Sequence, residues 1–183
     1  MSSIFQFLDR FQYHRISQDE SNNPVLPQIA KIGKKISQLP HINNSSASIA
    51  FHFGKRMIIT KNNANIDQLQ RNDLIEIIDV DPVKNTALYF GPSPPPLISP
   101  ILWMIGYAKQ EIQYVVFLEK NSKKHSFSTS IPNIKKEDVF IEMIKSILKQ
   151  LRNQEIIRIN TDILILTAQT EEQMYKNIKI IEK

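Results

Sequence analysis

The stretch SIAFHFGKRMIIT, residues 48–60, decides the fold. In residues 48–53, small or polar side chains alternate with large apolar ones, which is the two-residue period of a half-buried strand. Gly54 and Lys55 then turn the chain, and residues 56–60 return as a hairpin partner. The clearest local signal in the sequence is therefore a β-hairpin.

Further strands are predicted downstream of this hairpin. Residues 74–80 and 86–90 have strand character, with a turn at residues 81–85 between them. Four strands in sequence order predict a mainly antiparallel sheet. Residues 114–118 are nearly all apolar, which is typical of a central strand buried on both faces. Two more strands are predicted, at residues 156–160 and 163–166.

Apolar residues at helical spacing flank these strands. We predict helices at residues 24–39, 99–110 and 133–152, and a last helix that begins with a capping box at residues 170–173. Trp103 is expected in the core or at a subunit contact. The mixture of helices and strands over 183 residues predicts one α/β domain, residues 1–183, with residues 1–24 as an N-terminal helical extension.

Composition excludes several classes of site. The chain has no cysteine, which excludes disulfides, thiolate nucleophiles and cysteine-ligated metals. Its four glycines lie far apart, so no glycine-rich phosphate loop is present. There is no apolar run of the length that a membrane span needs, and the first residues do not have the pattern of a signal peptide. We expect a cytoplasmic protein without a membrane partner.

The net charge of +5 has two interpretations. It can reflect an anionic partner, or the lysine-rich composition of a protein from an AT-rich genome. The basic residues are scattered rather than held on one helix face, which favours the second interpretation. We do not expect nucleic acid to be a partner.

Three stretches, in order from about residue 25 to the end, carry a resemblance to a known family. They are MIIT at residues 57–60 with DLI at 73–75, PILWMI at 100–105 with VV at 115–116, and ILIL at 163–166 with QTEE at 169–172. Together they resemble the class II aldolase/adducin family, of the fuculose-phosphate aldolase kind. The resemblance implies a three-layer αβα fold with a mainly antiparallel central sheet, and a homo-oligomer, in this family typically a tetramer.

The resemblance also implies where a metal site belongs. Enzymes of the family hold zinc or another divalent cation with three histidines. In this sequence the first two positions are occupied by Phe117 and Glu119, and the third histidine and its glycine are replaced by Thr161 and Asp162. Phenylalanine cannot ligate a metal, so we predict no metal and no cofactor. A cation held by the carboxylates of Glu119 and Asp162 remains an alternative, although Phe117 would crowd it.

The remaining family positions differ in the same way. The glutamate that acts as acid and base falls at Ile98, or at Pro95 in another register, and neither side chain can carry a proton. The phosphate-binding loop aligns with residues 45–48, where Ser48 matches and Ser46 is a partial substitute for an asparagine. We therefore predict no catalytic residue, only a remnant cleft. Its predicted members are Ser46, Ser48, Ile98, Phe117, Glu119, Thr161 and Asp162.

A few polar residues outside these motifs are further candidates. His41 follows a proline near the former phosphate loop, and Lys123 and Lys124 belong to a basic segment after the strand that would carry the metal pair. These three are candidate anion-binding residues. His52 is predicted on the polar face of its strand, either as a replacement acid/base or as a surface histidine, and we favour the surface histidine.

The function predicted from these observations is that of a non-catalytic member of the family, retained for binding or assembly. A small anionic ligand fits this interpretation. The alternative is a diverged lyase or isomerase, of the aldehyde-lyase or epimerase type, acting on a phosphorylated sugar or a similar small anionic metabolite. In that case His52, Glu119 or Asp162 would carry the chemistry.

Overall fold

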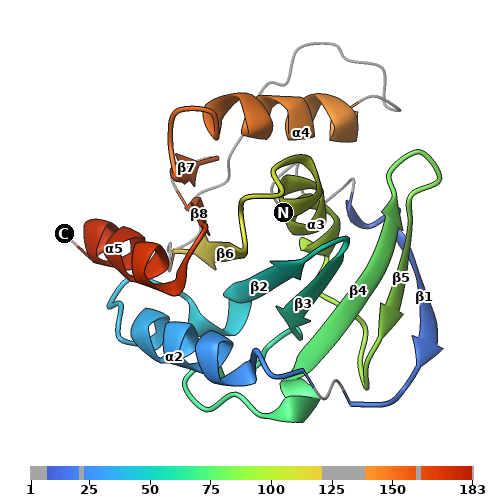
Figure 1. Ribbon diagram of the computed structural model, residues 1–183, viewed down its shortest axis with the longest axis horizontal. Coiled ribbons are helices and arrows are strands. Elements are labelled where there is room, and N and C mark those ends of the chain that lie inside the picture. Colours follow the sequence, from blue (N-terminus) through green and yellow to red (C-terminus); the bar gives the residue numbers. More distant parts are fainter. Residues whose placement is uncertain (1–7, 21–22, 121–138, 160–161, 183) are drawn as a thin grey trace.

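A single eight-stranded sheet organises the chain (Figure 1). The computed structural model describes residues 8–20, 23–120, 139–159 and 162–182. The strand order across the sheet is β1-β5-β4-β3-β2-β6-β8-β7. The predicted α/β class is confirmed.

The strands predicted around the opening hairpin are all present. They are β2 Ser48–Phe53, β3 Arg56–Thr60, β4 Leu74–Asp81 and β5 Thr86–Phe90, each antiparallel to the next. Gly54 lies between β2 and β3 with a positive φ of 59°, a conformation that glycine adopts without steric cost. The four predicted strands and the predicted hairpin are thus confirmed.

The second half of the sheet is built around the predicted central strand. This strand, β6 Tyr114–Glu119, pairs antiparallel with β2 on one side and with β8 Ile163–Ala168 on the other. Its residues 114–118 are all buried, because helices cover both faces of the sheet at this point. Strand β7 Ile156–Arg158 closes this edge of the sheet.

The N-terminal segment corrects two predictions. Residues 12–17, part of the predicted helical extension, form strand β1 Gln12–Ser17 instead. This strand runs parallel to β5, so the sheet is mixed rather than mainly antiparallel. The strand forms because Tyr13 and Arg15 share one face, where Tyr13 packs against the core and Arg15 hydrogen-bonds the hydroxyl of Tyr89 at 3.0 Å. The first seven residues of the predicted helix lie outside the described residues.

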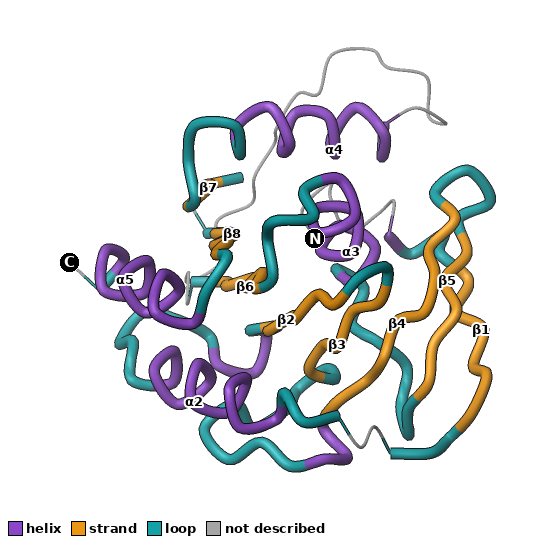
Figure 2. Tube along the Cα trace, in the orientation of Figure 1, coloured by secondary structure: helices purple, strands orange, loops and turns teal. Residues whose placement is uncertain are grey.

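Two pairs of helices cover the sheet (Figure 2). Helices α2 Leu26–Ser37 and α5 Glu171–Ile181 pack together on one face, against β2 and β8. Helices α3 Ser99–Ala108 and α4 Val139–Gln150 pack together on the other face. Alternate residues along β6 therefore enter two different cores, with Val116 on the α2–α5 side and Val115 and Phe117 on the α3–α4 side.

The helix ends agree only partly with the predicted caps. Thr170 caps α5 by accepting a hydrogen bond from the backbone N–H of Gln173, as predicted, but the Gln173 side chain accepts from Gln169 rather than completing the box. Helix α2 begins at Leu26, later than predicted, because Asn23 accepts a hydrogen bond from the N–H of Val25 and forms a turn before the helix. Short 3-10 turns, Asn44–Ser46 and Arg71–Asp73, precede β2 and β4.

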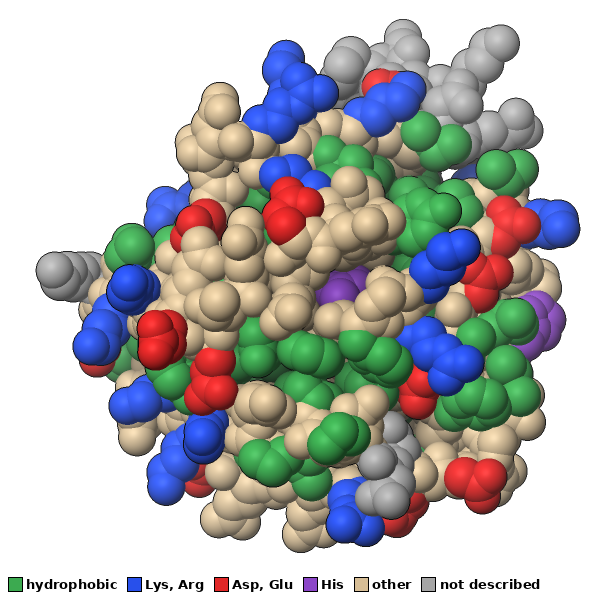
Figure 3. All heavy atoms as spheres, viewed as in Figure 1, with side chains coloured by type: hydrophobic (Ala, Val, Ile, Leu, Met, Phe, Trp, Pro, Cys, Tyr) green, Lys and Arg blue, Asp and Glu red, His purple; other side chains and the backbone are tan. Residues whose placement is uncertain are grey.

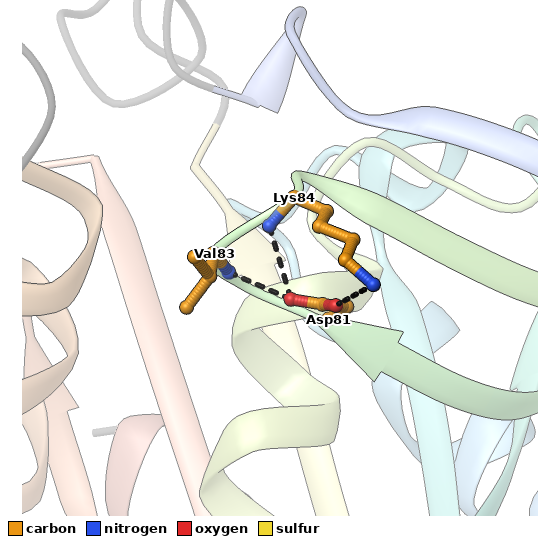
Figure 4. Close-up of polar contacts among 3 residues, drawn as sticks. All are labelled: Asp81, Val83 and Lys84. Carbon is orange, nitrogen blue, oxygen red and sulfur yellow. Dashed lines mark hydrogen bonds and ion pairs between the residues drawn. The ribbon is translucent and has the colours of Figure 1, made fainter.

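The turn between β4 and β5 is held by one carboxylate (Figure 4). One oxygen of Asp81 accepts hydrogen bonds from the backbone N–H groups of Val83 and Lys84, each at 3.0 Å, and the other lies 3.6 Å from the Lys84 ammonium. The hydrogen bond from the Lys84 backbone is the main cause of the lowered pKa of Asp81. Asn85 follows with a positive φ of 52°, a conformation that asparagine tolerates.

None of the described helices has the length and hydrophobicity that a bilayer span requires.

Candidate functional site

Phe117 occupies the position where the resemblance places the first metal-binding histidine. It lies on β6, opposite Ser48 of β2 and Ile165 of β8, and only 3% of its surface is exposed. Its side chain belongs to the apolar core between the sheet and helices α3 and α4. Because the ring is enclosed by hydrocarbon, this position contributes packing and offers no ligand atom.

Ile98, at the position of the family's acid/base glutamate, belongs to the same core. It directly precedes α3 and is 3% exposed. Pro95, the position in the alternative register, is also buried. The structure therefore places Ile98 and Phe117 in one apolar cluster, without a titratable group at either position.

Two carboxylate residues lie beyond Phe117 at the end of β6. Glu119 is opposite Ile163, and the backbone N–H of Lys120 donates to the carbonyl of Asp162 at 2.7 Å. Glu119 and Asp162 are both half-buried on neighbouring strand ends. Among the described residues, however, no group of three or more His, Asp or Glu side chains is arranged to hold a metal. The residues present at this end do not fit the family's zinc.

The segment before β2 runs alongside this end of β6. Ile42 forms an isolated bridge with Lys120, and the N–H of Asn43 donates to the carbonyl of Glu119 at 2.8 Å. This arrangement brings the segment that the resemblance aligns with a phosphate-binding loop next to the strand that it aligns with the metal pair. Ser46 is half-buried there, Ser48 is buried and His41 is exposed.

The structure thus gathers five of the predicted cleft residues at one end of the sheet. These are Ser46, Ser48, Phe117, Glu119 and Asp162. Ile98 belongs to the same apolar core as Phe117, and His41 lies on the adjoining loop. Thr161, Lys123 and Lys124 lie outside the described residues.

The prediction that His52 lies at the surface is wrong. Its side chain points from β2 to helix α3 and is only 6% exposed. Gly106 of α3 makes room for it, since a Cβ at that glycine would lie 2.1 Å from Nδ1 of the imidazole. The alternation in β2 was read correctly, but both faces of this strand are covered by helices.

The buried imidazole of His52 has an unusual environment. Its Nε2 is buried and has no hydrogen-bond partner among the residues that the structure describes. Burial lowers the pKa of His52 from 6.5 to about 4, and a hydrogen bond to the backbone of Leu102 opposes this shift in part. His52 is therefore neutral at physiological pH, and it lies in the packing between strand and helix.

The sequence prediction missed a polar pocket at the opposite end of β6. Lys109 and Glu111 contribute to it from the α3–β6 connection, Arg152 and Glu155 from the α4–β7 connection, and Gln173 from α5. These residues come from three separate parts of the chain, and no local motif links them.

Charges on the surface are distributed as the sequence suggested. On the face shown in Figure 3, Lys and Arg side chains are interspersed with Asp and Glu, and apolar side chains form a band between the β2–β3 hairpin and helix α2. This face offers no continuous basic surface of the kind that follows a nucleic-acid backbone.

The sequence matches no protein-family profile and no curated protein sequence, and its similarity to known proteins is found in the fold. An L-fuculose 1-phosphate aldolase superposes with a TM-score of 0.62 at 11% identity, covering 89% of this chain and 84% of that one. YgbL from Klebsiella pneumoniae gives 0.60 at 9% identity, covering 85% and 84%. The L-fuculose-1-phosphate aldolase from Thermus thermophilus gives 0.56 at 15% identity, covering 86% and 87%. The likeness is one of fold, and at that level it confirms the predicted resemblance.

Proposed function

We propose that this chain, which has the fold of the class II aldolases, is a non-catalytic protein retained for binding or assembly. The burial of Phe117 carries the proposal. In this fold the reaction needs a cation that stabilises negative charge developing on the substrate, and a group that moves a proton. Phe117 and Ile98 contribute only packing at those two positions.

The polar residues that remain near Phe117 favour binding over chemistry. Ser46 and Ser48 keep hydroxyl groups in the former phosphate segment, and His41 lies on the exposed loop before it. Hydroxyl groups and imidazole suit a small anion without performing chemistry on it. For assembly, we propose the homo-oligomer that the resemblance implies, a tetramer in the cytoplasm, with the three-layer αβα arrangement in each subunit.

Metal analysis tests the first part of this proposal. The purified protein is dialysed against zinc and, separately, manganese, and its metal content is then measured. We expect well under one ion per chain. One tightly bound ion per chain, lost in the double variant Glu119→Gln/Asp162→Asn, would overturn the proposal, because it would show a cation site built from carboxylates.

An activity screen tests the second part. Aldol cleavage and epimerisation of L-fuculose 1-phosphate and pentose phosphates are followed with and without added divalent metal. We expect no turnover above that of a heat-inactivated sample. Sedimentation of the same protein measures the subunit number, and a monomer at micromolar concentration would contradict the assembly role.

The alternative of a diverged lyase or isomerase rests on one observation, the proximity of Glu119 and Asp162 at neighbouring strand ends. If either carboxylate moves a proton, then Glu119→Gln or Asp162→Asn should abolish turnover while the unfolding midpoint stays unchanged. His52 is a weaker candidate for this role, because its imidazole is buried beneath Gly106.

A further inference from the structure

The polar pocket at the start of β6 is distant from the remnant cleft. It lies where β6 begins and β8 ends, next to the hydrogen bond from the N–H of Gln113 to the carbonyl of Ala168 at 3.0 Å. Phe117 and Glu119 lie toward the other end of β6. A ligand in this pocket would therefore not contact the residues of the remnant cleft.

The walls of the pocket are tied together by hydrogen bonds. The Lys109 ammonium donates to the carbonyl of Leu151 at 2.8 Å, which joins the end of α3 to the end of α4. The N–H and the hydroxyl of Thr167 both donate to the carbonyl of Glu155, at 2.8 and 3.2 Å. These bonds hold the three connecting segments of the pocket in place before any ligand arrives.

The carboxylate of Glu155 is already engaged by hydrogen-bond donors from α5. It accepts hydrogen bonds from the side-chain amides of Gln173 and Asn177. Glu111 differs, since its one ion pair within the described residues is with Lys109 at 3.7 Å, and 52% of its side chain is exposed. Glu111, with this single ion pair and an exposed side chain, is therefore the carboxylate of this pocket that a ligand cation can reach.

The cation that is free to receive an anionic group is Arg152. Its guanidinium is exposed and has no hydrogen-bond or ion-pair partner among the described residues. A guanidinium forms paired hydrogen bonds with a carboxylate. Arg152 and Glu111 thus offer opposite charges on the lining of one pocket.

The rest of the lining restricts the chemistry of the ligand. Asn153, Gln154 and Gln169, which carry side-chain amides, line the pocket, whereas the amide of Gln173 is already hydrogen-bonded to Gln169 and Glu155. Ile112 adds an apolar contact, and the lining contains no aromatic ring on which a base could stack. The volume of about 300 Å³ lies at the lower limit for small-molecule sites.

We propose that this pocket binds a small amino acid, with the carboxylate of the ligand on Arg152, its ammonium on Glu111 and a polar side chain on the amide groups. The site is independent of the proposed function at the remnant cleft. The Lys109 ammonium is held by the Leu151 carbonyl and by Glu111, and the Thr167 hydroxyl donates to the Glu155 carbonyl, so we assign the site a binding role. A ligand there would contact the connections that follow α3 and α4 and the start of α5.

L-Glutamine is the probe that matches the lining, and calorimetric titration measures its binding to the full chain. Glutaramate, which lacks the ammonium, and inorganic phosphate are the comparison ligands. We expect saturable binding of L-glutamine, at least about tenfold weaker binding of glutaramate, and none of phosphate at this site.

Substitutions of the pocket residues test whether L-glutamine binds in this pocket. Arg152→Gln should weaken L-glutamine binding by about tenfold or more, and Glu111→Gln should do the same for L-glutamine but not for glutaramate. The matched control is Lys149→Gln, which removes the same charge from an exposed residue of α4 outside the pocket. No saturable binding of L-glutamine, equal binding of glutaramate, or an equal effect of Lys149→Gln would overturn the proposal.

Discussion

His52 makes a definite contribution to the pH dependence of stability. Its imidazole is enclosed between β2 and α3, and burial lowers its pKa from 6.5 to about 4. In the unfolded chain the ring is in water and binds a proton at its ordinary pKa. Between these two pKa values the unfolded state binds more protons than the folded state does, so the free energy of unfolding falls as the pH falls.

The size of this contribution follows from the shift. The unfolded chain gains its proton below pH 6.5, and the folded protein does so only near pH 4. The stability lost across this range through His52 alone is about 3 kcal/mol. A loss of this size is a large fraction of the stability of a small domain, about 5–15 kcal/mol.

The assay compares urea unfolding at several pH values for the unsubstituted protein and for His52→Gln. Glutamine retains a donor for the Leu102 backbone and does not titrate. Carboxylates elsewhere titrate in both proteins, so the difference between the two free energies isolates the histidine. We expect this difference to change by about 3 kcal/mol between neutral pH and pH 4, in the direction that favours the glutamine variant at acid pH.

His14, exposed on β1, provides the control. The variant His14→Gln should follow the unsubstituted protein at every pH. A constant difference between His52→Gln and the unsubstituted protein from neutral pH to pH 4 would refute the reasoning, since it would mean that the imidazole of His52 is protonated equally easily in the folded and unfolded states.

Three further outcomes can be tested by the same unfolding assay. Gly106→Ala should destabilise the protein by about 2 kcal/mol in urea unfolding, because the new Cβ meets His52 at 2.1 Å, and the double variant with His52→Ala should recover most of the loss. Phe117→Ala should cost about 4 kcal/mol by the same assay, whereas a loss below about 1 kcal/mol would place the ring outside the core. Asp81→Asn should be less harmful at acid than at neutral pH, since the lowered pKa of Asp81 stabilises the fold above its ordinary pKa, and this contribution is lost as the pH falls through the lowered value.

The alternation in residues 48–53 predicted strand β2 because a period-two pattern reports which residues share a face. It does not report what covers that face. In β2, Ala50 and His52 alternate with larger apolar residues whether the opposite face meets water or a helix, so the burial of His52 followed only from the position of α3. Strand β1 was missed for a related reason, since Leu8 and Phe11 continue a helical spacing up to the residue where the strand begins.

The end of β6 was predicted in part because the resemblance assigns Ser48, Phe117 and Glu119 to one site. The strand register agrees, since it places Ser48 opposite Phe117 and Glu119 opposite Ile163. The pocket around Arg152 was not predictable, because three connections build it and their meeting depends on how α4 packs against α3. Side chains in such connections carry no periodic signal.

Restoring two histidines should not restore a metal site at the end of β6. The variant Phe117→His/Glu119→His places both imidazoles on the same face of the strand, but position 117 faces the core around Ile98. There the imidazole would be buried without a hydrogen-bond partner, which costs about 2 kcal/mol in addition to the lost packing. We expect a less stable protein that retains no zinc after dialysis. A variant that binds one zinc per chain with undiminished stability would contradict this expectation. It would show that two substitutions suffice for a metal site at this end of the sheet, and that the packing of α3 on the sheet does not need the Phe117 ring.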